Sequence, residues 1–319
     1  MRRDAHRAAD TDRGAGAGRR RRGVAFLAAL GGCALVATSA APAGAHGGGH
    51  GSGTGAGHGS GGTRAYVALG DSYTSGPLIP QQVDANCARS DRNYPSLVSA
   101  RIRTSAFKDV SCGGATTEHM WKPQGTNGPQ LDALSRNTDL VTVQIGGNDI
   151  GFGSIISTCA GLYAQDPSGD PCRRYYRTKG VDQLSVTIAR TAPRIAQVLR
   201  AVHARAPHAR VVVVGYPALL PDDGSGCAPQ VPFATKDFPY LRDTEKRLNL
   251  MLRLVALVSR AEYVDTYGPT VGHDMCKAPE VRWIEPLRPS APAAPAHPNA
   301  KGEAAMAEAV LNRLDRGRR

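Results

Sequence analysis

Leu140-Val141-Thr142-Val143-Gln144-Ile145 is a short apolar run that ends at Gly146-Gly147. Runs of this length with little apolar–polar alternation are typical of strands buried on both faces of a parallel sheet. Four other segments have a similar character, two of them strong and two weaker. They are Tyr66 to Leu69 and Val211 to Val214, each followed by glycine, and Phe107 to Ser111 and Tyr263 to Asp265. The sequence therefore predicts a buried, mostly parallel sheet.

Helical patterns separate these runs. Three segments carry them, namely Val181 to Ala206, Leu241 to Arg260 and Asn299 to Leu314. Strands that alternate with helices predict an α/β fold, a three-layer α/β/α sandwich around a central, mostly parallel sheet. We expect residues 63–319 to form one such domain.

Chemistry-bearing residues follow several of these strands at the end where open α/β sheets bind ligands. Gly70-Asp71-Ser72-Tyr73 comes directly after the first strand. A serine at a strand-to-helix turn can expose its hydroxyl at the sheet edge, and the first N–H groups of the helix favour negative charge there. The motif by itself is more typical of an ordinary helix cap.

Two glycine-rich turns follow other predicted strands. Cys112-Gly113-Gly114 leaves backbone N–H groups unshielded, and Gly147-Asn148-Asp149 supplies a side-chain amide that can stabilise an oxyanion. Each segment, taken singly, is also compatible with a plain turn.

Near the C-terminus, His297 precedes Pro298, a residue suited to the first position of a helix. Histidine titrates near neutral pH, as a general base must. Other candidates are His119, His203, His208 and His273. His203 and His208 fit surface roles at the end of a long helix, whereas His273 lies in a loop near Cys276 and could line the site.

Taken in order, Gly70-Asp71-Ser72-Tyr73, Gly114, Gly147-Asn148-Asp149 and His297-Pro298-Asn299 resemble the four blocks of SGNH (GDSL) hydrolases, which have a flavodoxin-like fold. The resemblance extends from about Tyr66 to Gly302 and is closest to secreted bacterial esterases and lipases with three disulfides. It implies that Ser72 is the nucleophile and His297 the general base. It also implies an oxyanion hole formed by the Ser72 and Gly114 N–H groups and the Asn148 amide.

The chain departs from the family pattern at one position. Many members have an aspartate three residues before the histidine, but Ala294 occupies that position here. We expect a Ser–His dyad in which a main-chain carbonyl, from around Ala294 or more broadly from Trp283 to Pro295, accepts from His297 Nδ1. The rival interpretation places an acid from elsewhere, such as Asp274, on the histidine.

The predicted reaction is hydrolysis of carboxylic esters, acyl or lipid, through an acyl-enzyme on Ser72, with no metal or organic cofactor. Two long segments, residues 153–180 and 217–237, are expected to rim the pocket. Five apolar residues could accept an acyl chain, namely Phe152, Ile155, Ile156, Leu219 and Leu220. The alternatives are a carbohydrate acetylesterase and a non-catalytic binding protein on the same scaffold. The binding protein would need a broken Ser, Asn or His position, and none is broken.

The N-terminal region indicates export. Residues 1–45 combine an arginine block, an apolar stretch and Ala43-Gly44-Ala45, as in a signal peptide. Cys33 offers a lipoprotein site as a minor alternative. Residues 46–62 are almost all Gly, Ser and His, which predicts a flexible linker that is more typical of a spacer than of a metal site. The apolar stretch is shorter than a membrane span, and we expect no stable membrane anchor.

Charge and cysteine content support the same class. Removing eight Arg and three Asp with residues 1–45 lowers the formal net charge from +12 to +7, and the remaining basic residues are scattered. We therefore expect no nucleic-acid partner, and a monomer. Six cysteines remain after the signal peptide, and an even number in an exported chain favours disulfides. The family resemblance implies the pairs Cys87–Cys112, Cys159–Cys172 and Cys227–Cys276.

Overall fold

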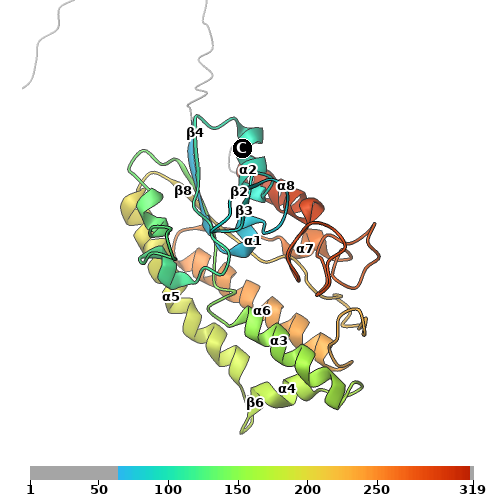
Figure 1. The fold of residues 1–319 in the computed structure, drawn as a ribbon. Helices are drawn as coiled ribbons and strands as arrows, with labels where there is room; N and C mark the ends of the chain where they lie inside the picture. The colour runs from blue at the N-terminus through green and yellow to red at the C-terminus, as the bar shows by residue number, and fades with distance from the viewer. Residues whose placement is uncertain (1–63, 317–319) are drawn as a thin grey trace, which may run out of the picture. The chain divides into compact units, whose positions relative to one another are not determined.

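A five-stranded sheet lies at the centre of the computed structural model, which describes residues 64–316 (Figure 1). The predicted signal peptide, the linker and Cys33 lie outside the described residues. The strand order is β4-β1-β5-β8-β9, and every neighbouring pair is parallel. The strands are β1 (Ala65–Gly70), β4 (Ala106–Asp109), β5 (Leu140–Gln144), β8 (Arg210–Val214) and β9 (Glu262–Val264). The predicted parallel sheet is confirmed.

The strand order places a topological switch point between β1 and β5. The chain moves outward in one direction from β1 to β4, and in the other direction from β5 to β8. In doubly wound sheets the crevice at such a point is where ligands bind. Gly70 at the end of β1 pairs with Gln144 at the end of β5, so the segments carrying Ser72 and Asn148 leave the sheet side by side.

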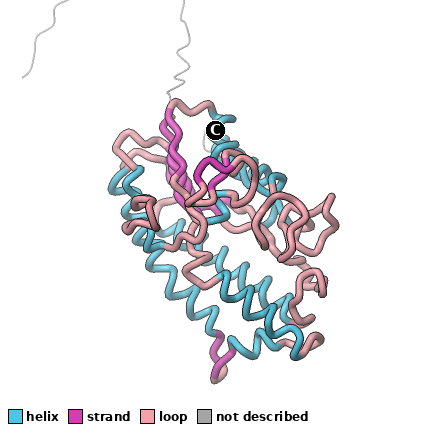
Figure 2. Tube along the Cα trace, viewed as in Figure 1, coloured by secondary structure: helices cyan, strands magenta, loops and turns pink. Residues whose placement is uncertain are grey.

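Helices cover both faces of the sheet (Figures 1 and 2). Alternate residues of β1 face opposite layers: Val67 and Leu69 belong to one apolar cluster, and Tyr66 and Ala68 to the other. The helices α5 (Gln183–Arg205) and α6 (Asp237–Val258) contribute to the first cluster. The helices α2 (Tyr94–Ile102) and α8 (Ala300–Arg316) contribute to the second. The three-layer prediction is therefore confirmed.

The long helices differ from the predicted ranges by a few residues at their ends, for local reasons. Val181 belongs to a short strand, and Asp182 caps α5 by accepting from the Ser185 N–H at 3.1 Å. Asn299, predicted as the first residue of the last helix, instead precedes α8, and its Oδ1 accepts from the Lys301 and Gly302 N–H groups. Such side-chain caps satisfy N–H groups that the helix itself leaves free.

Shorter elements connect these layers. The remaining strands are β2 (Gln82–Asp84), β3 (Arg89–Ser90), β6 (Arg177–Thr178) and β7 (Val181–Asp182). The remaining α-helices are α1 (Ser72–Ser75), α3 (Phe152–Leu162), α4 (Pro171–Tyr176) and α7 (Tyr267–Thr270). The 3-10 helices are η1 (Thr117–Met120), η2 (Gln130–Ala133) and η3 (Tyr163–Gln165).

Three disulfides join the loops and short helices around the sheet. They are Cys87–Cys112, Cys159–Cys172 and Cys227–Cys276, the pairs that the family resemblance implies. The third closes the longest span, 49 residues. Beside this disulfide, the Met275 N–H donates to the Leu219 carbonyl at 3.1 Å. The disulfide and the hydrogen bond together fix the loop after β8 to the loop that contains Met275 and Cys276.

Candidate active site

Ser72 is the first residue of α1, two residues after the end of strand β1. Asp71 is the N-cap, and its Oδ1 accepts from the Tyr73 N–H at 3.0 Å. The turn before the serine is tight, because a Cβ on Gly70 would lie 2.1 Å from Thr74 Oγ1 and 2.9 Å from the Gln144 carbonyl oxygen. Only glycine fits there, and the turn fixes the serine at the sheet edge.

His297 lies against the serine, although the two residues are 225 positions apart in the chain. Its Nε2 is 2.7 Å from Ser72 Oγ. The imidazole stacks on the Tyr73 ring at 4.7 Å between centroids, and the Phe152 ring meets it edge-on at 6.0 Å. These contacts hold one face and one edge of the ring, so its orientation toward the serine is set by packing.

The carbonyl that accepts from His297 Nδ1 is that of Pro295, at 2.8 Å. It lies within the predicted range Trp283 to Pro295, but one residue after Ala294, the position named first. The Ala294 carbonyl closes a turn by accepting from the His297 N–H at 3.2 Å. Pro295 and a left-handed Ala296 (φ 61°) occupy the two middle positions, as in a type II turn. Because the turn uses the Ala294 carbonyl, that of Pro295 is the one left to face the ring.

The turn is itself anchored. The Tyr73 hydroxyl donates to the Ala296 carbonyl at 2.6 Å, and backbone hydrogen bonds join Ala296 and His297 to Glu285. The Glu285 carboxylate accepts in turn from Arg282, from Asn299 and from two backbone N–H groups. A buried ion pair whose carboxylate also accepts from Asn299 and the backbone makes a rigid support for the histidine.

No carboxylate among residues 64–316 hydrogen-bonds to His297. Asp274, the rival to a main-chain carbonyl, accepts from the Cys276 N–H at 2.9 Å instead. The competing histidines are engaged elsewhere too: His273 stacks on Trp283 at 3.5 Å, His203 pairs with the Ser259 carbonyl, and His119 accepts from the Thr116 N–H. The geometry therefore brings one histidine to Ser72, with a main-chain carbonyl behind it.

Asn148 lies in the turn after β5, half-buried beside the serine. Its Nδ2 donates to the Ala115 carbonyl at 2.9 Å, which fixes the direction of the amide and leaves its second N–H free. The neighbouring Asp149 accepts from the Thr117 N–H at 2.9 Å and from its hydroxyl. The two turns that carry the predicted oxyanion donors are thus tied together.

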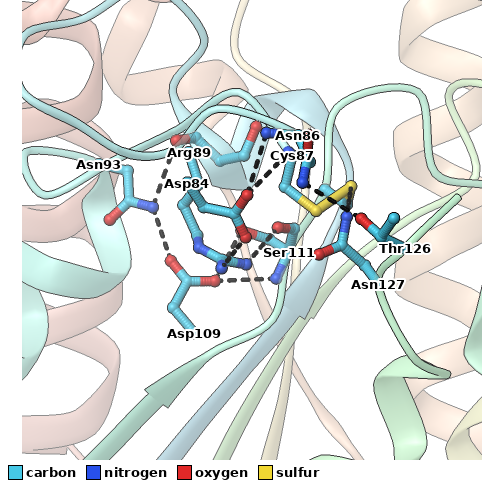
Figure 3. A network of polar contacts seen from close by, with 11 residues as sticks. Asp84, Asn86, Cys87, Arg89, Asn93, Asp109, Ser111, Thr126 and Asn127 are labelled. Carbon is cyan, nitrogen blue, oxygen red and sulfur yellow. Dashed lines mark hydrogen bonds and ion pairs between the residues drawn. A yellow bond between two sulfur atoms is a disulfide. The ribbon is translucent and has the colours of Figure 1, made fainter. Parts of the chain in front are cut away.

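Gly114 lies in the loop after β4, in the left-handed region at φ 77°. Neither its N–H nor that of Ser72 donates to an acceptor among the described residues. Figure 3 shows the polar network that holds the chain before this loop: Asp109 accepts from Asn93 and Ser111, beside the Cys87–Cys112 disulfide. The network and the disulfide therefore anchor the chain up to Cys112, and the free Gly114 N–H lies two residues beyond that anchor.

We expect Asn148→Ala to lower kcat/KM for a simple ester by about 10²- to 10³-fold, because removing one oxyanion donor has an effect of that size. The loss should fall mainly on kcat. Asn127→Ala serves as the matched control, since the Asn127 side chain makes only a long contact with Cys112 Sγ, at 3.9 Å. An unchanged kcat in Asn148→Ala would contradict the assignment.

Two residues that the sequence analysis did not assign join the serine turn to the Asn148 turn. The Tyr216 hydroxyl donates to Asp71 Oδ2 at 2.5 Å and accepts from the Gly147 N–H at 2.8 Å. Burial raises the pKa of Asp71 to about 7, and the hydrogen bonds from Tyr216 and Tyr73 offset this only in part. The signal in the sequence was the position of Tyr216, directly after a predicted strand and its glycine.

The surroundings of His297 also change its titration. Burial lowers the pKa of His297 from 6.5 to about 4, and the hydrogen bond to Pro295 opposes this only partly. A general base must be neutral to accept a proton, and a lowered pKa extends the neutral form to lower pH. The histidine is therefore ready to act throughout the range from about pH 5 upward.

We expect the acid limb of kcat/KM against pH to lie near pH 4 rather than near 6.5, because kcat/KM reports the free enzyme. The measurement is a pH series with a substrate that has no titrating group. An acid limb at pH 6.5 or above would contradict the prediction. Asp71 lies nearby and has a pKa of about 7, so it could also produce such a limb. If the limb at pH 6.5 or above persisted in Asp71→Asn, Asp71 would be excluded as its source.

A cavity that is partly open to solvent lies beside the serine. Its wall is almost entirely apolar and comes mainly from α3, α6 and the loop after β8. The five residues predicted to accept an acyl chain all line it, namely Phe152, Ile155, Ile156, Leu219 and Leu220. Ser72 and Asn148 lie in the same wall. An apolar chain in this cavity would end at the serine hydroxyl.

Comparison with known proteins decides the family. Residues 68–305 match the model of the GDSL-like lipase/acylhydrolase family, a span that contains every residue of the site. The chain belongs to this family. Two relatives illustrate the likeness. Lipase 2 of Streptomyces coelicolor is 42% identical, with 79% of this chain and 86% of that protein covered. An esterase of Streptomyces scabiei is 32% identical, with 92% and 94% covered.

Solved structures agree with this GDSL-like assignment. The crystal structure of phospholipase A1 from Streptomyces albidoflavus NA297 matches with a TM-score of 0.66 and 28% identity, over 79% of this chain and 99% of that one. An extracellular lipase from Streptomyces rimosus matches with a TM-score of 0.65 and 29% identity, over the same shares. The protein is thus a carboxylic ester hydrolase with the SGNH hydrolase fold.

Proposed function

We propose that this GDSL-like hydrolase is a secreted serine esterase of the lipase type that cleaves acyl or lipid esters with Ser72 and His297 as a catalytic dyad. The observation that carries the proposal is the 2.7 Å contact between His297 Nε2 and Ser72 Oγ at the wall of an apolar cavity. A nucleophile within hydrogen-bond reach of a base that a third group orients is the arrangement required for covalent catalysis.

The proposed reaction has two halves. Ser72 Oγ attacks the ester carbonyl carbon as His297 Nε2 takes the hydroxyl proton, and the tetrahedral intermediate collapses when the alcohol leaves with that proton. Water then attacks the acyl-enzyme with the same histidine as base, and the acid is released. The Pro295 carbonyl keeps the proton on Nδ1, so that Nε2 is free to accept.

The oxyanion of each tetrahedral intermediate needs donors that are already in place. We assign this role to the Ser72 and Gly114 N–H groups and the free N–H of Asn148. The first two lack acceptors among the described residues, and Ala115 fixes the third. A carbonyl stabilises the imidazolium less than a carboxylate would, so these donors carry a larger share of catalysis in a dyad.

The cavity favours an acyl chain over a small acetyl group. Its wall is mostly apolar, as the binding of an acyl chain requires, and several relatives are named lipases. The deciding experiment is a chain-length series of 4-nitrophenyl esters, with phospholipid and acetyl-xylan in parallel. We expect kcat/KM to rise from acetate to a medium-chain ester by at least about tenfold, because each buried methylene contributes roughly 0.8 kcal/mol.

A bulky residue in the cavity should shift the preferred substrate to shorter acyl chains. In Ile155→Trp the maximum should move to shorter chains while acetate hydrolysis is retained, and Ile102→Trp, on the other side of the sheet, should leave the series unchanged. A maximum at acetate in the native protein, with rapid cleavage of acetyl-xylan, would instead support the acetylesterase alternative.

Secretion is part of the proposal. Three disulfides are typical of exported proteins, and a related Streptomyces rimosus lipase is described as extracellular. Over the range 64–316, no helix is both long and apolar enough to cross a membrane. Mass spectrometry of protein from the culture medium should find a chain that begins at residue 46, after the predicted signal peptide. The expected monomeric state stays a prediction.

A further inference from the structure

A few polar groups interrupt the mostly apolar wall of the cavity, and the Glu245 carboxyl is one of them. Glu245, on α6, lines the cavity together with Ser72, and only 8% of its surface is exposed. Its Oε2 accepts from the Leu219 N–H at 3.2 Å. Its Oε1 is buried and has no hydrogen-bond partner among the described residues. A buried polar atom without a partner is rare, because burial removes its hydrogen bonds to water.

The reaction proposed above does not use this carboxyl. His297 is oriented by Pro295, and the oxyanion donors belong to the turns after β1, β4 and β5. The nearest apolar neighbours of Glu245 along α6 that also line the cavity are Leu241 and Leu248, one helical turn to either side. The carboxyl is therefore placed where the chain of an acyl group would pass.

Burial raises the pKa of Glu245 well above its usual range, and the Leu219 N–H offsets this only in part. Burial therefore favours the neutral form of this carboxyl, which carries one O–H donor and retains acceptor capacity. A saturated hydrocarbon chain offers it neither an acceptor nor a donor. A hydroxyl group on the chain offers both, and a keto group offers an acceptor.

Resting on the proposed function, we propose that Glu245 is a specificity-determining residue that selects acyl chains bearing an oxygen function, hydroxyl or keto, at one position along the chain. The selection follows from two observations: Glu245 lines the cavity, and its buried Oε1 has no hydrogen-bond partner among the described residues. A site that hydrogen-bonds a substrate group discriminates against analogues that lack the group, because its own buried polar atom is then left unpaired.

The test is a set of methyl decanoates, each with a single hydroxyl at a different carbon, assayed by methanol release beside methyl decanoate itself. We expect kcat/KM for one regioisomer to exceed those of isomers two carbons away by at least about tenfold. The keto analogue at the same carbon should share the preference. In Glu245→Leu that isomer should lose its advantage, whereas methyl decanoate should change by less than about threefold.

Two variants serve as comparisons. Glu245→Gln keeps a donor and an acceptor in the same shape and should keep the regioisomer preference. Glu303→Gln is the matched control, because Glu303 is also buried with an unpartnered Oε1 but lies on the opposite face of the sheet. Its regioisomer profile should equal that of the native protein.

A flat regioisomer profile in the native protein would overturn the proposal, even if Glu245→Leu fails to fold. An equal loss for every ester in Glu245→Leu would also overturn it, since the residue would then be structural. Either result leaves the Ser72 mechanism intact as long as hydrolysis of methyl decanoate is lost in Ser72→Ala. Hydrolysis that survives in Ser72→Ala would instead contradict the proposed function itself.

Discussion

The Ser72→Ala variant is expected to lose ester hydrolysis by at least about 10⁴-fold in kcat, because removal of a nucleophile abolishes the covalent route and leaves only binding and the oxyanion donors. KM should change much less, since the cavity wall is untouched. The measurement is steady-state hydrolysis of a medium-chain 4-nitrophenyl ester, with active sites counted by a fluorophosphonate that labels activated serines. We expect no labelling of Ser72→Ala.

Ser75→Ala is the matched control for this experiment. Ser75 lies on the same short helix, is buried, and has a hydroxyl with no partner among the described residues. Its removal should leave both hydrolysis and labelling within about threefold of the native protein, because no bond to the reacting atoms is lost. If Ser72→Ala retained activity close to that of Ser75→Ala, the nucleophile would have to be another residue.

The second large effect is expected for His297→Ala. Without a base, Ser72 Oγ keeps its proton at neutral pH, and kcat should again fall by at least about 10⁴-fold. Ser72 and His297 act as a unit at 2.7 Å, so the double variant should be hardly worse than either single one. Additive losses in the double variant would contradict a shared role.

A further variant tests whether a main-chain carbonyl, rather than a carboxylate, orients His297. Asp274→Asn should change kcat by less than about threefold, because Asp274 bonds to the Cys276 N–H and not to His297. A loss as large as that of Ser72→Ala would show that a carboxylate orients the histidine after all. The thermal midpoint of each variant, measured in parallel, separates lost chemistry from lost folding.

Much of this arrangement was predictable from the sequence. The valine-rich runs ending in glycine predicted the buried strands, and the residues after them predicted where Ser72 and Asn148 lie. The reason is that parallel strands align their carboxyl ends, so strand ends found separately in the sequence meet at one edge. The weaker runs near Phe107 and Tyr263 were also strands, although shifted by about a residue.

The remaining details depend on tertiary contacts that no local pattern encodes. The orienting carbonyl was predicted around Ala294, within the range Trp283 to Pro295, and the sequence did not single out Pro295. The turn that uses the Ala294 carbonyl depends on a left-handed Ala296, and alanine rarely adopts that conformation. Similarly, the sequence pattern places Glu245 among the polar residues of an amphipathic helix. Only the folded structure shows that it lines the cavity.

The separation of 225 residues between Ser72 and His297 has a consequence for the order of events during refolding. The nucleophile follows the first strand of the domain, whereas its base precedes the last helix. No fragment that ends before residue 297 can therefore hydrolyse an ester by this route, however well its sheet has formed. The appearance of esterase activity in a refolding experiment reports the arrival of the C-terminal segment, and should lag behind the burial of the strands.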